Sequence, residues 1–264
     1  MPDASHTYAE LPRGLNAELP RGLSPRLLLA LVPLVIVCGL AFDQHGGALG
    51  QPVVVGVTWL VFAALLLRTD VAGRTMMLTC LVYATVGEVL LSLVWQVYDY
   101  RLGNLPLFVP PGHVLLFLLG LSVAPRVTPA IVRVVTVGAV AVVAVLAFTA
   151  RDTFSAVLVA VFVASVVRGR HRALYATMFV LALIMELYGT WLGNWHWNAS
   201  VGTTGLVTLN PPVAAGAFYC ALDLLVMLSM RVLGRRSSQP VIAGSAGQTI
   251  AASAAVPLVS HRHS

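Results

Sequence analysis

The sequence predicts an all-α integral membrane protein with eight transmembrane helices, on three observations. First, 58% of the 264 residues are hydrophobic and only 10% are charged, and the mean hydropathy is +0.88, whereas about a quarter of the residues of a soluble domain are charged. Second, eight apolar segments approach the roughly 20 residues that cross a bilayer. Third, the arginines concentrate in alternate connections between these segments.

The eight apolar segments lie between two polar tails. Residues 1–25 are polar and proline-rich, and residues 234–264 are rich in serine, alanine and glycine. Both are expected to be disordered cytoplasmic tails. The second and sixth segments are short, which leaves their boundaries open. The predicted spans are 26–42, 52–67, 75–98, 110–124, 130–149, 153–167, 172–192 and 211–233.

The arginines also predict the orientation of the chain. All 16 basic residues are arginines, and with the N-terminus inside, only Arg101 and Arg151 fall in outer loops. Basic loops stay in the cytoplasm, so the distribution favours eight spans with both termini cytoplasmic. The expected location is a bacterial cytoplasmic membrane. Because the arginines are scattered over short loops, they predict no nucleic-acid partner.

A set of features recurs about a hundred residues apart. Each copy has a glutamate inside an apolar helix, then a pair of aromatic residues, then Pro-Pro, which is expected to open the next helix. Four spans separate the copies, so a parallel 4+4 duplication with halves 26–124 and 125–233 is favoured over chance recurrence. The recurring residues are Glu88, Tyr98, Tyr100, Pro110 and Pro111, then Glu186, Trp195, Trp197, Pro211 and Pro212.

Three carboxylic acids fall inside predicted spans, namely Glu88, Glu186 and Asp223. A charge in hydrocarbon costs at least a few kcal/mol, so each acid must find a cation or hydrogen-bond donors, or stay protonated. No arginine shares the predicted membrane interior with them. The sequence therefore predicts at least one neutral carboxylic acid that can donate a proton. For any one of the three, a structural acid bonded to Tyr, Trp or Thr remains the alternative.

Helical spacing and composition also predict the surroundings of the acids. Part of the aromatic pattern needs no function, because Trp and Tyr gather at membrane interfaces. Ser92, Trp95 and Asp99 are expected on the face of Glu88, and Thr190, Gly193 and Trp197 on the face of Glu186. The expected substrate-binding residues are Trp95, Tyr98, Tyr100, Trp191, Trp195, Trp197, Asn210 and His113.

The absence of several sequence motifs disfavours some classes of reaction. The sequence has no aspartate-rich run for magnesium and diphosphate, no glycine-rich phosphate loop and no GxSxG. His113 and His196 could make a metal site with Glu88, Glu186, Asp99 and Asp223, but the sequence has no HxxxH, HxxE or ExxH pair, so neither a metal nor another cofactor is predicted. Ionisation of a prenyl diphosphate is therefore disfavoured. Protonation of an alkene by a buried carboxylic acid fits the residues, with the resulting cation held over Trp and Tyr faces.

The stretch from Glu88 through WQVYDY and LG to a proline-rich re-entry resembles the membrane carotenoid hydratases that act on bacterioruberin precursors. Residues 186–223 resemble the G-x-W-x-W stretch of that family, and the likeness covers roughly residues 80–225. More distantly, the helix count and buried acids are similar to small membrane lycopene and terpene cyclases. The resemblance implies protonation of a double bond, then addition of water or ring closure. It also implies Glu88 and Asp223 as the leading acid–base residues, with Glu186 third.

Three functions therefore compete. The first is a membrane enzyme that hydrates or cyclises a hydrophobic isoprenoid lipid, with Glu88 or Asp223 as the acid and Glu186 as the base. The second is a proton-coupled transporter with duplicated halves, because buried acids also serve proton relays. The third is a membrane chaperone without chemistry. The inner halves of the predicted spans hold no polar ladder, which favours the enzyme over the transporter.

Overall fold

The structure is a computed structural model that describes residues 18–237, with side chains up to residue 233. Most of both predicted tails lies outside the described residues. Residues 18–24, predicted as tail, pack on the end of the second helix, where the Thr69 hydroxyl donates to the Arg21 carbonyl at 3.0 Å. The elements are α1 Pro25–His45, η2 Gly47–Leu49, α2 Gly50–Arg68, α3 Val71–Glu88, η3 Val89–Val94, β1 Tyr98–Tyr100, α4 Val109–Val123, η4 Ala124–Arg126, α5 Pro129–Phe148, α6 Phe154–Arg168, α7 Arg172–Leu192, β2 Trp195–Trp197 and α8 Gly216–Ser237.

Seven segments of the described chain are long and apolar enough to cross a membrane, which fits a multi-pass membrane protein. The prediction of eight spans is thus met by seven full-length spans and a shorter helix, α6. With 15 residues, α6 is about 22 Å long at 1.5 Å per residue. The seven spans are Pro25–His45, Gly47–Arg68, Val71–Val94, Val109–Arg126, Pro129–Phe148, Arg172–Leu192 and Gly216–Leu233.

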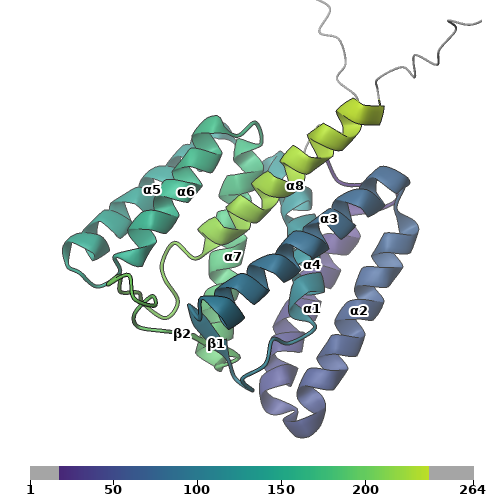
Figure 1. Cartoon of the computed structure of the whole chain (residues 1–264). Helices are drawn as coiled ribbons and strands as arrows, with labels where there is room; N and C mark the ends of the chain where they lie inside the picture. Colours follow the sequence, from purple (N-terminus) through teal and green to yellow (C-terminus); the bar gives the residue numbers. More distant parts are fainter. Residues whose placement is uncertain (1–17, 238–264) are drawn as a thin grey trace, which may run out of the picture.

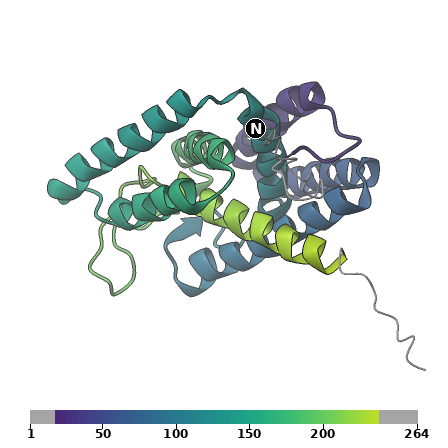
Figure 2. The ribbon, with the colours of Figure 1, turned by 90° about the horizontal axis from the view of Figure 1, so that it is seen from above.

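Four helices form the centre of the molecule. In Figures 1 and 2, α1 and α2 lie on one flank, α5 and α6 lie on the other, and α3, α4, α7 and α8 lie between them. Within this centre α3 packs on α8 and α4 packs on α7. The strands β1 and β2 lie together at one end of the bundle (Figure 1), which is called the sheet end below.

Helix starts follow from local sequence. Asp70 caps α3, because its carboxylate accepts a bond from the Gly73 amide at 2.9 Å. Pro110 and Pro111 lie in the first turn of α4, as predicted. The same prediction is wrong for α8. Pro211 and Pro212 lie in the preceding loop, and α8 begins only at Gly216.

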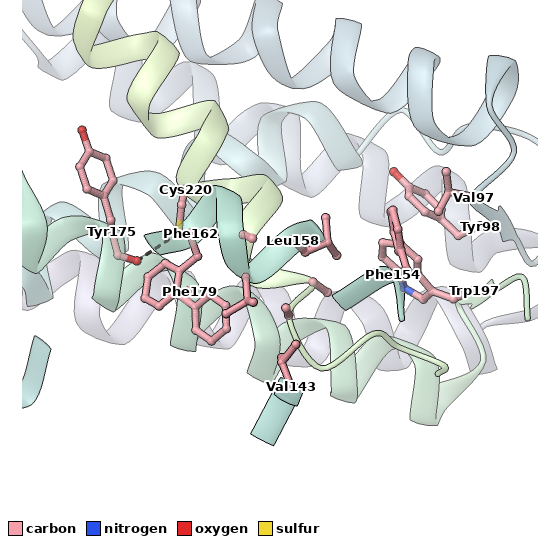
Figure 3. Packing of buried hydrophobic residues seen from close by; sticks show 14 of the residues in the cluster. Val97, Tyr98, Val143, Phe154, Leu158, Phe162, Tyr175, Phe179, Trp197 and Cys220 are labelled. Atoms are coloured by element: carbon pink, nitrogen blue, oxygen red, sulfur yellow. Dashed lines mark hydrogen bonds between the residues drawn. The ribbon is translucent and has the colours of Figure 1, made fainter. Parts of the chain in front are cut away.

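Buried apolar side chains form two clusters around α4 and α7. One cluster surrounds α4, whose residues from Val114 to Leu119 are all buried. The other joins α5, α6 and α7 to the strands, and Figure 3 shows it from Phe162 and Phe179 across Phe154 to Trp197. Outward faces are apolar too, as for Phe148 of α5, which is 93% exposed. Apolar outward faces are expected where helices contact lipid.

Candidate functional site

Glu88 is the last residue of α3 and is buried. The chain continues as the π-helix η3, in which the Trp95 amide bonds the Leu90 carbonyl five residues back. It then turns at Gln96, where φ is +52°, and enters β1. The helix thus ends before Asp99, so the predicted common helical face of Glu88 and Asp99 is wrong. Asp99 is exposed and bonds Asn198 instead.

The turn after η3 brings the two tyrosines of β1 back onto Glu88. The Tyr98 and Tyr100 hydroxyls donate to Glu88 Oε2 at 2.8 and 2.6 Å. Both side chains lie on the buried face of the strand, because alternate residues point to the same side. Burial and the nearby Glu88 carboxylate raise the pKa of both phenols well above the usual value. The two phenols therefore keep their protons and act as donors.

Glu186 is also buried and has the same kind of partners from β2. The indole nitrogens of Trp195 and Trp197 donate to Glu186 Oε2 at 2.8 and 3.1 Å. Here α7 ends on Gly193, whose φ of +86° forms a left-handed cap. The Trp195 ring crosses α7 directly over Gly189, where a Cβ would lie 2.0 Å from the ring. Glycine at this position permits the close approach.

The two strands pair with each other, which joins the two glutamates in one site. β1 and β2 are antiparallel, with Tyr98 opposite Trp197 and Tyr100 opposite Trp195. All four rings lie on the buried face of this two-stranded sheet. The Tyr98 and Trp197 ring centroids are 4.8 Å apart. The sheet therefore presents a wall of four aromatic donors to two carboxylates.

His113 and Tyr219 complete the connection between the carboxylates. His113 Nε2 lies 3.3 Å from Glu88 Oε1, and the Tyr219 hydroxyl donates to Glu186 Oε1 at 3.4 Å. Their rings stack with centroids 4.7 Å apart and an interplanar angle of 4°. Tyr219 was not among the predicted site residues. Its signal in the sequence is a lone tyrosine in an apolar helix, one turn before Asp223.

The hydrogen bond of His113 to the backbone orients its ring toward Glu88. His113 Nδ1 lies 3.0 Å from the Val109 carbonyl, which can only accept, so Nδ1 carries a hydrogen. His113 Nε2 then faces Glu88 Oε1 at 3.3 Å. Glu186, by contrast, receives donors on both oxygens.

Two apolar cavities meet at this cluster. One has a volume of about 620 Å³ and extends toward α1, α2 and α4, past Leu40 and Val54. The other has a volume of about 890 Å³ and lies between α3 and α8, past Leu91 and Leu222. The residues that line both cavities are Glu88, Tyr98, His113, Glu186 and Tyr219.

The loops that carry the strands are tied to other helices by groups that the sequence pattern did not single out. Arg101, directly after β1, donates to the Asp43 carbonyl at 2.6 Å, and its side chain lies 3.6 Å from the Asp43 carboxylate. Asn194, directly before β2, donates to the same carboxylate at 2.7 Å. The loop after β2 is bound by Asp152, which accepts from the Val213 amide at 3.0 Å. Buried polar contacts of this kind fix the position of both strands.

The remaining predicted residues lie at different places. Trp95 lines the larger cavity at its edge. Asn210 supports β2 from behind, because its side-chain oxygen accepts from the Trp197 amide at 2.9 Å. Trp191 is 78% exposed and lines neither cavity, so it does not belong to the site.

Asp223 lies one helical turn beyond Tyr219 on α8, outside both cavities. It is fully buried, and neither carboxylate oxygen has a hydrogen-bond partner among the described residues. The structure thus brings Glu88 and Glu186 together in one site and leaves Asp223 apart from them.

The polar groups at the site are carboxylates, phenols, indoles and one imidazole. In the described part of the chain, no three His, Cys, Asp or Glu residues come together as a metal site. Such a set of groups can hold and transfer protons beside an apolar ligand. In comparisons with known proteins, no family model, no curated protein and no solved structure matches the chain.

Proposed function

We propose that the chain is a membrane enzyme of isoprenoid metabolism that protonates an alkene of a carotenoid or terpenoid lipid, giving a hydrated or cyclised product. One observation carries the proposal. Two buried glutamates, each bonded by two aromatic donors of a single sheet, lie where two apolar cavities meet. A site that binds an apolar chain and offers a proton suits the protonation of an alkene. Within residues 18–233, no Arg or Lys lines the two cavities, so the site is not suited to an anionic substrate.

The contacts support different roles for the two glutamates. Glu88 faces the imidazole of His113 at 3.3 Å, and an imidazole can take up and release a proton, so this pair is the proposed acid. Glu186 receives two indole N–H groups and one phenol O–H, and all of these stabilise a carboxylate. Glu186 is therefore the proposed base. Asp223, the other acid predicted from sequence, lines neither cavity and has no part in this assignment.

The proposed reaction begins when the acid O–H bond breaks and its proton forms a C–H bond with one alkene carbon, which leaves a carbocation on the other carbon. For hydration, a water oxygen bonds to the cation and loses a proton to Glu186. For ring closure, a second alkene bonds to the cation and Glu186 removes a proton from the new cation. The proton then returns to the Glu88–His113 pair. Tyr219 bonds Glu186 and stacks on His113, so its side chain lies beside both the proposed base and the proposed acid.

The aromatic wall suits the cationic intermediate. Tyr98 and Trp197 border the larger cavity, and Tyr100 and Trp195 border the smaller one. A cation over such a ring is stabilised by roughly 2 kcal/mol or more when water is excluded. The ring faces would therefore favour the cation over the neutral alkene, which is the differential binding that lowers a barrier.

The two cavities support a substrate that extends on both sides of the reacting carbon. Leu90 and Leu225 flank the larger cavity and are about half exposed between α3 and α8. A lipid could enter there from the bilayer, pass the carboxylates and place its far end in the smaller cavity. This arrangement favours a long linear polyprenyl chain that reacts at an internal double bond.

The finer topology predicted from sequence belongs to the same proposal. The matched donors on Glu88 and Glu186, and the matched packing of α3 on α8 and α4 on α7, support a parallel 4+4 duplication. The arginine distribution supports cytoplasmic termini. The catalytic cluster would then lie toward the outer side of a bacterial cytoplasmic membrane.

The test is a comparison of lipid extracts. The full chain, Glu88→Gln and Glu186→Gln are expressed in a bacterium engineered to make lycopene and shorter polyprenes. Asp99→Asn is the matched control, because Asp99 is a carboxylate of β1 that faces away from the site. We expect a product one water heavier, or an isomer of unchanged mass, in the native and Asp99→Asn extracts only. Identical extracts with and without well-expressed native protein would overturn the proposal.

A proton-coupled carrier is the second candidate, and Asp223 favours it. Its buried and unpartnered carboxylate lies one turn beyond Tyr219, away from the sheet end. Together with Glu186 it could form a relay across the bundle. Proton flux in vesicles would distinguish the functions. A flux that Asp223→Asn abolishes would support a carrier, whereas the enzyme requires no flux.

A further inference from the structure

A third hollow lies at the end of the molecule opposite the strands. It has a volume of about 1350 Å³ and is bounded by η4, the start of α5, the end of α6 and the start of α7. Three arginines line it, Arg133 from α5 and Arg170 and Arg172 on either side of His171. Among the residues that the structure describes, no carboxylate lines this hollow. It is therefore strongly positive.

Two helices begin at the rim of this basic hollow. Pro129 starts α5 and Arg172 starts α7, and both residues line the hollow. The first amides of a helix carry a partial positive charge and point away from the helix. The side chain of His171, which precedes α7, forms no capping hydrogen bond to that helix. The uncapped start of α7 thus adds to the field of the arginines, whereas Thr128 caps α5 by accepting from the Ile131 amide at 3.3 Å.

The floor of the hollow is apolar. Val132 and Val166 are buried there, and Leu174 closes it from α7. A site for a small soluble anion needs no such floor, whereas a phospholipid presents a phosphate joined to apolar chains. Basic pockets between transmembrane helices are a known way to hold such head groups.

We propose that this hollow binds the phosphate of an anionic membrane lipid, with Arg133, Arg170 and Arg172 around the phosphate and the acyl chains over Val132 and Val166. Guanidinium groups bind phosphate oxygens through paired charge-assisted hydrogen bonds. The proposal does not depend on the reaction at Glu88 and Glu186, because it concerns the opposite end of the bundle.

His171 is suited to join the site as a neutral donor. Burial, followed by the charges of Arg231 and Arg170, lowers the pKa of His171. Its Nε2 lies 3.4 Å from Arg231, which can only donate, so Nε2 is the acceptor and Nδ1 carries the hydrogen. That N–H is available to a phosphate oxygen.

The arginines could instead serve only to orient the chain in the membrane. Other arginines at the same end separate these two roles. Arg21, Arg26 and Arg68 are exposed at that end but do not line the hollow. Orientation alone predicts that all arginines at this end affect lipid binding equally. A specific lipid-binding site predicts that only the arginines that line the hollow affect lipid binding.

The experiment measures lipid binding to the purified full chain in neutral detergent by native mass spectrometry. The ligands are phosphatidylglycerol, diacylglycerol and inorganic phosphate. The variants are Arg133→Gln/Arg170→Gln/Arg172→Gln and the control Arg21→Gln/Arg26→Gln/Arg68→Gln. Each arginine near an anionic lipid is worth roughly fivefold in affinity, so we expect about hundredfold weaker phosphatidylglycerol binding in the first variant and little change in the second.

Equal weakening in both triple variants would overturn the proposal. So would diacylglycerol binding as tightly as phosphatidylglycerol, or full displacement of the lipid by millimolar inorganic phosphate. Equal unfolding temperatures of the variants in lipid-free detergent establish that folding is unchanged. If the lining triple variant does not fold, Arg133→Gln alone is compared with Arg68→Gln, and an affinity loss of about fivefold specific to Arg133 is expected.

Discussion

In the Glu88 segment (residues 88–113) the carboxylate accepts two phenol O–H groups and faces an imidazole. In the Glu186 segment (residues 186–219) it accepts two indole N–H groups and one phenol. An imidazole can take up and release a proton, whereas an indole can only donate a hydrogen bond. The two similar frameworks therefore differ in chemistry: the Glu88 carboxylate faces an imidazole, whereas the three side-chain partners of Glu186 only donate hydrogen bonds to it.

The two segments also reach the same geometry through different helix ends. Tyr98 follows Glu88 by ten residues, and Trp195 follows Glu186 by nine. The extra residue of the Glu88 segment is absorbed by the π-helix η3, since a π-turn holds one residue more than an α-turn. The Glu186 segment needs no such insertion and ends on Gly193. Hydrogen bonding to the carboxylate, rather than helix geometry, is what the two segments share.

The largest expected effect separates the proposed acid from the proposed base. Glu88→Gln and Glu186→Gln should each lower product formation by about a hundredfold or more, because each removes an acid–base group. In D₂O, however, Glu186→Gln should still exchange deuterium into recovered substrate, since the Glu88–His113 pair can protonate the alkene and take the proton back. Mass spectrometry of recovered substrate measures this. Exchange that persists in Glu88→Gln and stops in Glu186→Gln would reverse the assignment.

The next effect is on stability. Replacement of Trp195 and Trp197 by Phe removes two bonds to a buried carboxylate and leaves space behind, at a total cost of about 4 kcal/mol. Replacement of Tyr98 and Tyr100 by Phe removes two bonds with almost no change of volume, at about 2 kcal/mol. Reversible unfolding in mixed detergent measures both. Equal losses of unfolding free energy in the two double variants would mean that the volume of the rings does not contribute to stability at β1 and β2.

A smaller effect on stability is expected when a glycine of α7 or of α3 is replaced by alanine. Gly189→Ala should destabilise the protein by about 2 kcal/mol, because the new Cβ overlaps the Trp195 ring. Gly87→Ala, beside Glu88, should be neutral or stabilise by up to about 1 kcal/mol, because nothing lies within 4 Å of its Cβ. Thermal unfolding of both variants checks this pair. A neutral Gly189→Ala would show that Trp195 can move without loss.

The last expected effect is absent at neutral pH and is the dependence of stability on alkaline pH. The pKa of Tyr98 and Tyr100 is raised in the folded protein, so above their unfolded pKa of about 10 the folded state binds more protons than the unfolded state. The contribution of the two phenols to the free energy of unfolding is therefore fully present below pH 10 and is lost as the pH rises further. The loss is about 1 kcal/mol for each phenol and each pH unit. Tyr98→Phe/Tyr100→Phe should reduce this fall, whereas Trp195→Phe/Trp197→Phe should not, because indole does not titrate. Unfolding curves between pH 9 and 11 measure the difference.

Hydropathy alone predicted the eight α-helices of the described chain, seven of them long enough to cross a membrane, because each must be apolar over most of its length to contact lipid or the core. The glutamates could be chosen from sequence because a carboxylic acid in an apolar helix needs a specific reason. The partners were harder to predict. Helical periodicity pointed from Glu88 to Asp99, but the π-helix and the turn at Gln96 direct Tyr98 and Tyr100 to the carboxylate instead.

Other parts of the site depend on contacts between distant segments. Tyr219 reaches Glu186 only because α8 packs beside α7. Trp191 has the same residue type and nearly the same place as Trp195, yet it is still helical and points outward. The close approach of Gly189 to Trp195 is likewise invisible in a linear sequence, since a glycine inside a helix does not by itself reveal which side chain packs against it.

The strand pair has a consequence for how the protein forms. Tyr98 and Trp197 are almost a hundred positions apart in the chain, yet they are partners in the sheet. Closure of such a long loop has a high entropic barrier, and such contacts form late in folding. During synthesis, α3 and α4 must enter the membrane before β2 exists. Glu88 is then present without Glu186, so the cluster of two carboxylates forms only when the second half of the chain has been inserted.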